Sequence, residues 1–193
     1  MSPRKGLELR DILSKATEIA DTKGVEAVTL ATLARELKVK SPSLYNHVDG
    51  LNGLRRKLAL YGTEKLYEVL SNAAVGKAGD SALLEIAEAY LKFSRVHPGL
   101  YDLTLTAPDQ KDTELLKASE KILNLVLKVL EFYHLEKNDA LHAVRGFRSI
   151  IHGFASLEQK EGFKLNLDRD DSYRFLVGTF LTGIHAVQKK EHE

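Results

Sequence analysis

The strongest constraint on the fold is a helical spacing of apolar residues that continues through almost the whole chain. Residues 7–23 show it clearly, because their apolar side chains recur three, four and seven positions apart, along one face of an α-helix. No segment alternates strictly between apolar and polar residues, as a half-buried strand does. We therefore predict an all-α fold of about nine helices.

Short turns divide this pattern into separate helices, and capping residues mark several of the boundaries. Gly24 is expected to end the first helix and Thr29 to cap the second. Ser41 is expected to cap the third, with Pro42 at its first position. The expected helices cover residues 7–23, 30–37, 42–47, 54–74, 81–96, 100–105, 113–133, 138–159 (or 137–159) and 171–189.

Two further features concern the organisation of the chain. Residues 49–53 are expected to form a turn, and apolar side chains almost all round the segment 113–133 predict a buried central helix. We expect residues 1–53 to form one domain, from which a connecting helix, 54–74, leads to a larger domain of residues 75–193.

Charge is distributed unevenly between these two parts. The first 60 residues hold eleven Lys and Arg against seven Asp and Glu, whereas the remainder holds 17 against 20. A basic N-terminal segment joined to an acidic remainder favours a nucleic-acid-binding domain attached to a domain with another function.

Composition excludes several classes of protein. The chain has no cysteine, which excludes disulfides, thiolate zinc sites and a cysteine nucleophile and suits a reducing cytosol. The purest apolar stretch, residues 175–184, is far shorter than the roughly 20 residues that span a bilayer, and no signal peptide is recognisable. The histidines lack metal-site spacing, and no nucleophile elbow, phosphate loop or dinucleotide motif occurs. We expect a soluble cytoplasmic protein without metal, cofactor or enzymatic activity.

Two short helices near the N-terminus form the most informative local pattern. The second and third expected helices are joined by a turn of three to four residues, the arrangement of a helix-turn-helix. The second helix of such a motif is short enough to lie in the DNA major groove. Four polar residues of this helix and its turn are expected to face away from the buried Leu44, namely Lys40, Ser41, Ser43 and Asn46.

The segment TLATLARELKVKSPSLYNHVDGLNGL, residues 29–54, resembles the DNA-binding signature of the TetR/AcrR family of one-component repressors. The most specific part is the run L-Y-x-H, residues 44–47, after a helix that begins with proline. Later segments, HPGLY at 97–101 and RSIIHGFASLE at 148–158, are similar to the ligand and dimer domain of the family.

The resemblance implies roles for matched positions. Thr29 would cap its helix and touch a phosphate, and Tyr45 and His47 would clamp the DNA backbone, while residues around the turn would face the bases. The full set of expected DNA contacts is Thr29, Ala31, Lys40, Ser41, Pro42, Ser43, Tyr45, Asn46, His47 and Arg55.

The chain departs from the family pattern directly after this motif. The family usually carries a phosphate-contacting lysine in the turn, where this sequence reads D-G-L-N at residues 49–52. Arg55, Arg56 and Lys57 lie one helical turn further on and are candidates to replace it; otherwise the affinity for DNA is weaker.

An effector pocket is expected, by the same resemblance, among the helices of residues 81–158. The hydroxyl of a buried tyrosine and the ring nitrogens of a buried histidine need hydrogen-bond partners. An arginine on a largely apolar helix forms an ion pair, is solvated or is open to an anionic ligand. The candidate lining residues are Tyr90, Phe93, His97, Tyr101, Arg145, Arg148 and His152.

The last helix is apolar over more than one face, which favours a second copy of the chain as its partner. With the preceding helix it is expected to form a two-fold four-helix bundle. The candidate interface residues are Phe147, Ile151, Phe154, Leu176, Phe180, Ile184 and Val187.

Together these features predict a homodimeric regulator, a repressor that a small molecule releases from a palindromic operator. The alternative is a helical carrier or enzyme that keeps a helix-turn-helix without using it. The D-G-L-N segment favours that alternative, whereas the charge distribution and the polar third helix argue against it.

Overall fold

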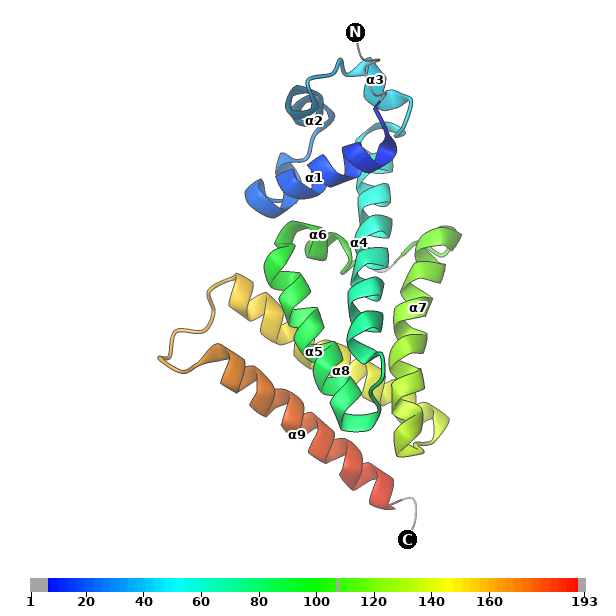
Figure 1. Ribbon diagram of the computed structural model, residues 1–193, viewed down its shortest axis with the longest axis vertical. Helices are drawn as coiled ribbons and strands as arrows, with labels where there is room; N and C mark the ends of the chain where they lie inside the picture. Colours follow the sequence, from blue (N-terminus) through cyan, green and yellow to red (C-terminus); the bar gives the residue numbers. More distant parts are fainter. Residues whose placement is uncertain (1–6, 107, 191–193) are drawn as a thin grey trace. The chain divides into compact units, whose positions relative to one another are not determined.

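The computed structural model describes residues 7–106 and 108–190, and within these ranges it consists of helices connected by loops (Figure 1). Nine α-helices and two short 3-10 helices are present and no strand occurs in the described part, which confirms the all-α prediction. Within the same ranges, no helix is both long and apolar enough to span a membrane. The α-helices are α1 (Leu9–Lys23), α2 (Leu30–Leu37), α3 (Pro42–Tyr45), α4 (Gly50–Ala74), α5 (Gly79–Val96), α6 (Pro98–Leu103), α7 (Thr113–Leu130), α8 (Lys137–Gln159) and α9 (Arg169–Lys190), and the 3-10 helices are η1 (Val25–Ala27) and η2 (Glu131–Tyr133).

The chain divides into two compact units. The N-terminal unit comprises residues 1–65 and 96–116, and the C-terminal unit comprises residues 66–95 and 117–193. The division falls inside α4, at the end of α5 and inside α7. As a result, α6 belongs to the same unit as α1, α2 and α3.

Buried apolar side chains hold the helices of the N-terminal unit together. Leu33 of α2, Leu44 of α3 and Leu54 of α4 are each fully buried. The predicted helix ends are confirmed at two positions. Gly24 ends α1 with a φ of 83°, in a region that costs glycine little, and the hydroxyl of Thr29 accepts a hydrogen bond from the N–H of Thr32 at 3.0 Å, capping α2.

Two local predictions in this unit are wrong. Ser41 makes no capping hydrogen bond, because its backbone is already helical (φ −50°, ψ −40°), whereas a capping residue needs an extended backbone. Residues 50–53 do not form a turn but the first turn of α4, in which the N–H of Gly53 bonds to the carbonyl of Asp49 at 3.2 Å. Burial of Leu54 and Leu58 at 0% exposure stabilises α4 despite its three glycines.

The prediction that α7 is a buried central helix is also wrong. Only Ala118, Val126 and Leu130 of this helix are buried, and Leu123 is exposed. Neighbouring helices therefore cover one side of α7, and most of its other apolar side chains are half-buried.

In the C-terminal unit, α8 and α9 lie side by side (Figure 1). The rings of Phe147 and Phe180 meet across them, with centroids 5.6 Å apart. Tyr173, near the start of α9, is buried and donates its hydroxyl to the carbonyl of Ala87 in α5 at 2.7 Å. This bond satisfies the one polar atom of the Tyr173 side chain inside the core.

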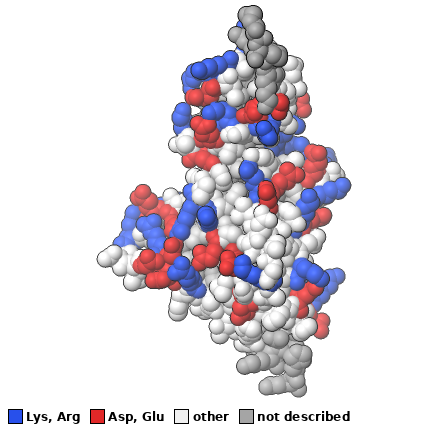
Figure 2. All heavy atoms as spheres, in the orientation of Figure 1, with Lys and Arg blue, Asp and Glu red and all other residues white. Residues whose placement is uncertain are grey.

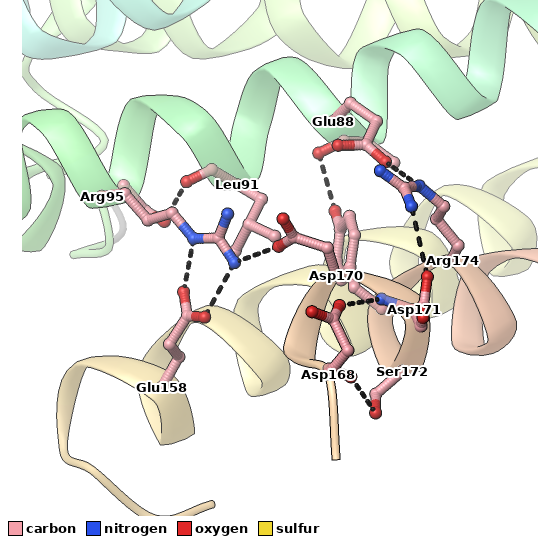
Figure 3. Close-up of polar contacts among 12 residues, drawn as sticks. Glu88, Leu91, Arg95, Glu158, Asp168, Asp170, Asp171, Ser172 and Arg174 are labelled. Atoms are coloured by element: carbon pink, nitrogen blue, oxygen red, sulfur yellow. Dashed lines mark hydrogen bonds and ion pairs between the residues drawn. The ribbon is translucent and has the colours of Figure 1, made fainter.

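A network of charges joins the corner between α8 and α9 to α5 (Figure 3). Arg95 donates to both carboxylate oxygens of Glu158, at 2.7 and 2.8 Å, and to Asp170 at 2.6 Å. The first turn of α9 is closed by Asp168, whose carboxylate accepts from the N–H of Asp171 at 2.9 Å. Bidentate pairing of this kind restricts the geometry more than a single contact does.

A second polar cluster lies where α5, η2 and α9 meet. The carboxylate of Asp80 accepts a hydrogen bond from the buried Tyr133 hydroxyl at 2.5 Å and lies 3.0 Å from Nε2 of His185. Burial alone would raise the pKa of Asp80. The hydrogen bonds from Tyr133 and His185 outweigh burial and hold this pKa below its usual value.

The lowered pKa of Asp80 predicts a pH dependence of stability. The ionised carboxylate contributes fully above the pKa of an unfolded aspartate, about 4, and its contribution is lost as pH falls through the lower folded-state value. We expect Asp80→Asn to lower the free energy of unfolding at pH 7, with a difference from wild type that shrinks below about pH 4. Urea unfolding at a series of pH values measures this. Glu120→Gln, an exposed carboxyl on α7, serves as the control, and an equal pH profile for both variants would contradict the assignment.

Candidate nucleic-acid interface

The sharp connection between α2 and α3 begins at Lys38, which adopts a left-handed backbone (φ 55°, ψ 40°). Its N–H bonds to the carbonyl of Arg35, and the N–H of Val39 bonds to the carbonyl of Ala34, which closes the end of α2. The short helix α3 then packs through a single fully buried residue, Leu44. This geometry is a helix-turn-helix whose second helix is anchored on one side only.

The remaining side chains of α3 and its flanks are accessible, and Tyr45 is 59% exposed, so its ring does not serve the core. Among the residues expected to contact DNA, six are exposed, namely Ala31, Lys40, Ser41, Pro42, Tyr45 and Asn46. The other four are half-buried, namely Thr29, Ser43, His47 and Arg55. All ten lie in one continuous segment from α2 to the start of α4.

The basic residues expected to replace the missing lysine differ in their surroundings. Arg55 donates from Nη2 to Glu26 of η1 at 2.9 Å, and its buried Nε has no hydrogen-bond partner within the described part of the chain. Arg56 is held by two acidic residues of the same unit and is half-buried. Lys57 makes no ion pair with any described residue, which leaves its ammonium available to a phosphate.

The acidic partners of these arginines have no local signal in the sequence. Glu26 lies 29 residues before Arg55, and Asp112 lies 56 residues after Arg56. Neither pair has helical or hairpin spacing, so only the folded chain reveals them. On the face that Figure 2 presents, acidic and basic side chains are correspondingly interspersed, without a large patch of one sign.

The residues expected to bind an effector are distributed over both units. Tyr90 and Phe93 are buried in α5 of the C-terminal unit, whereas Tyr101 is fully buried in α6 of the N-terminal unit. His97 is half-buried, and its Nδ1 lies 2.7 Å from a carboxylate oxygen of Asp21.

The three α8 candidates differ from these in exposure. Arg145 and Arg148 are exposed and form no ion pair with another described residue, so both guanidinium groups are solvated in the single chain. His152 is half-buried on the same helix.

The described residues of the C-terminal unit form, among others, a larger and a smaller surface groove. The larger, about 860 Å³, lies at the end of α7 and the start of α8 and is lined by Leu127, Phe132 and Leu141 among others. The smaller, about 590 Å³, lies at the corner that contains Arg95 and Asp170. Neither includes a residue from the expected effector set.

The candidate interface residues on α8 and α9 also differ in exposure. Phe147, Ile151, Phe154 and Ile184 are buried in the C-terminal unit. Two rings of α8 meet rings of α9: Phe147 meets Phe180, and Phe154 lies with its centroid 5.0 Å from that of Tyr173. Leu176 and Phe180 are half-buried, and Val187 is exposed. Between 169 and 187, the exposed uncharged residues of α9 are instead Phe175, Thr179, Thr182, Gly183, Ala186 and Val187, and Arg169, Asp171 and Arg174 are also exposed.

Metal chemistry has no geometric basis in the described ranges, where no three His, Asp or Glu side chains come close enough to share an ion. The candidate nucleic-acid interface from α2 to the start of α4 contains hydroxyl, amide, imidazole and ammonium groups, which suit hydrogen bonding and phosphate contact.

Comparison with known proteins agrees with this architecture. Residues 83–180 match the family described as "Tetracyclin repressor-like, C-terminal domain". The chain is 42% identical over 185 residues to the HTH-type transcriptional regulator YobS of Bacillus subtilis, covering 95% of this chain and 96% of YobS.

Solved structures show the same fold. The TetR transcriptional regulator SCO7222 of Streptomyces coelicolor superposes with a TM-score of 0.76 at 17% identity, covering 94% of this chain and 99% of that one. A TetR variant from Acinetobacter baumannii, in complex with minocycline, gives a TM-score of 0.72 at 18% identity, covering 94% and 98%. The proteins of this family are transcriptional regulators rather than enzymes.

The one-sided helix-turn-helix, the all-helical body and the match over residues 83–180 have a single explanation: the chain belongs to the TetR family of transcriptional regulators.

Proposed function

We propose that this protein is a homodimeric repressor that binds a palindromic operator through α2 and α3 and leaves it when a small molecule binds. The observation that carries the proposal is the arrangement of α3. One buried leucine, Leu44, anchors α3, while Tyr45 remains exposed, as do Lys40, Ser41 and Pro42. A helix held in this way is free to enter a major groove without loss of core packing.

The contacts with DNA fall into two classes. Thr29, Tyr45 and His47 contact backbone phosphates, and Lys57 supplies the cation that the D-G-L-N segment lacks. The bases are read by the residues around the turn, namely Ala31, Lys40, Ser41, Pro42, Ser43 and Asn46. Phosphate contacts orient the protein on the duplex, while contacts with base edges give sequence specificity. In this proposal residues 1–53 carry DNA binding and residues 75–193 carry effector binding and dimerisation.

The effector is a small molecule that binds among the helices of residues 81–158 in the cytoplasm. Support comes from the relative of the same fold solved with minocycline. Tyr90 and Phe93, buried on α5, offer the aromatic surface of such a pocket. An effector releases DNA only if it binds the DNA-free arrangement more tightly than the DNA-bound one.

The second copy of the chain packs on the outer face of α8 and α9. Phe175 is 78% exposed there, an unusual position for a large apolar side chain. A Cβ atom added at Gly153, Gly178 or Gly183 would meet nothing within 4 Å, so the chain itself does not require glycine for packing at these places. A partner helix that approaches closely would require it.

The DNA-binding surface is tested by replacing Tyr45. A hydrogen bond from its hydroxyl to a phosphate contributes about 1.5–3 kcal/mol, so Tyr45→Ala should weaken operator binding by about tenfold or more. The salt dependence should stay unchanged, because tyrosine carries no charge, whereas Lys57→Gln should lower the slope by about one. Fluorescence anisotropy with a duplex selected from a random pool by the wild-type protein measures both quantities.

The control for this experiment is Phe132→Ala, which removes an aromatic ring that is 56% exposed in the C-terminal unit. It should bind as wild type does. Equal affinities of the Tyr45→Ala variant and wild type would contradict the proposed interface.

The dimer surface is tested by Gly183→Glu. Glutamate has a higher helix propensity than glycine, Gly183 is exposed, and a Cβ atom added there meets nothing within 4 Å, so the fold should remain intact. Its side chain would obstruct a second copy, and we expect a shift from dimer to monomer in sedimentation velocity. Asn124→Glu, at an exposed position of α7, is the matched control and should remain dimeric. A Gly183→Glu variant that sediments as a dimer would show that the copies meet elsewhere.

A further inference from the structure

The end of α1 and the start of α6 are joined through one carboxylate, that of Asp21. Its Oδ1 accepts a hydrogen bond from the backbone N–H of Leu100 at 2.9 Å, and its Oδ2 lies 2.7 Å from Nδ1 of His97. The first N–H groups of a helix have no partner within the helix, and α6 receives no side-chain cap from its own N-cap residue, His97. Asp21 therefore caps α6 from a different helix, with its side chain 12% exposed.

The backbones of the two helices meet beside this contact. A Cβ atom added at Gly99 would lie 2.2 Å from the carbonyl oxygen of Ala20 and 2.3 Å from its carbon. No side chain fits at that distance, so only glycine allows α6 to lie this close to α1.

α6 also packs against α4. A Cβ atom added at Gly62 of α4 would lie 3.0 Å from side-chain atoms of Leu100 and Thr104. Leu100, which is fully buried, thus contacts α1 through its N–H group and α4 through its side chain. Since α1 and α4 flank α2 and α3 in the chain, α6 bridges the two helices that hold the helix-turn-helix.

A second ion pair fixes the chain beyond α6 to α4. Arg56 donates from Nε and Nη2 to the two carboxylate oxygens of Asp112, both at 2.6 Å, and from Nη2 to Glu114 at 2.8 Å. Hydrogen bonding from Arg56 lowers the pKa of Asp112, and the bonds to Asp112 and Glu114 raise the pKa of Arg56. Both groups therefore stay ionised at neutral pH.

From this geometry we propose that Asp21 and Asp112 are positioning residues for DNA binding. Asp21 holds α6 between α1 and α4, and Asp112 holds the following segment on α4, so that the two helices present α2 and α3 to the duplex at a fixed separation. The inference rests on the proposed function, and it adds α6 to the part of the protein that binds DNA. Neither aspartate contacts DNA in this account.

Electrostatics and positioning predict opposite effects on DNA affinity when one of these carboxylates is removed. Removal of a negative charge from a DNA-binding unit, taken alone, favours binding to the polyanionic duplex. If Asp21 positions the helices, Asp21→Ala must instead weaken binding, by roughly tenfold. Asp112→Asn should also weaken binding. The salt slope should stay at the wild-type value in both variants, because no phosphate contact is lost.

The measurement is an anisotropy titration with a duplex selected from a random pool by the wild-type protein, at several salt concentrations. Glu18→Ala on α1 is the matched control, since it removes an exposed carboxylate whose only ion-pair partner among the described residues is Lys15. It should bind as tightly as wild type or more tightly. Asp21→Asn should recover part of the affinity, because its amide oxygen still accepts from the N–H of Leu100.

The outcomes separate this inference from the proposed function. Two results, each obtained while the wild-type protein binds the duplex, would overturn the inference and leave the proposed function standing. One is an Asp21→Ala variant that binds as tightly as wild type. The other is an Asp112→Asn variant with a higher affinity and a steeper salt slope than wild type. Absence of binding by the wild-type protein would overturn both. If circular dichroism shows that Asp21→Ala is unfolded, the Asp21→Asn and Asp112→Asn variants decide the question, and wild-type affinity in both would overturn the inference.

Discussion

The N-terminal unit depends on a contact between α1 and α6, in which the backbones meet at Ala20 and Gly99. The residues joined by the hydrogen bond beside it, Asp21 and Leu100, are 79 positions apart in the chain. This contact brings the segment 96–116 into the same compact unit as the helix-turn-helix. The compact unit that contains the helix-turn-helix is therefore built from two separate stretches of sequence.

Local sequence signals predicted most of the helices because capping and amphipathic spacing act over only a few residues. Gly24 and Thr29 mark helix ends in the structure as they do in the sequence. The errors arose where packing overrides these signals. Ser41 has a helical backbone and cannot cap, and residues 50–53 continue α4 because leucines further along that helix are buried. The apolar pattern of 113–133 resembles that of a buried helix, but it does not indicate how many neighbours cover α7.

The candidate site was predictable as a list of residues but not as a set of interactions. A motif of continuous residues indicates which side chains surround Leu44, and these are accessible in the structure. The number of free cations was not predictable, because Arg55 and Arg56 are paired with acids distant in the sequence. Counting basic residues therefore overstates the charge that this unit presents to phosphates. In this account, operator binding depends less on net charge than on the exact placement of α3, which the contacts of Asp21 and Asp112 maintain.

Hydroxyl-radical footprinting of the protein on a duplex selected from a random pool tests the central claim most directly. Two copies that place α3 in successive major grooves should protect two equivalent half-sites. The centres of these half-sites should lie one helical turn of DNA apart, about 34–36 Å, or a multiple of that distance. The two footprints should be related by the symmetry of the palindrome. A single asymmetric footprint, or uniform protection without half-sites, would contradict a dimer that reads DNA through α2 and α3.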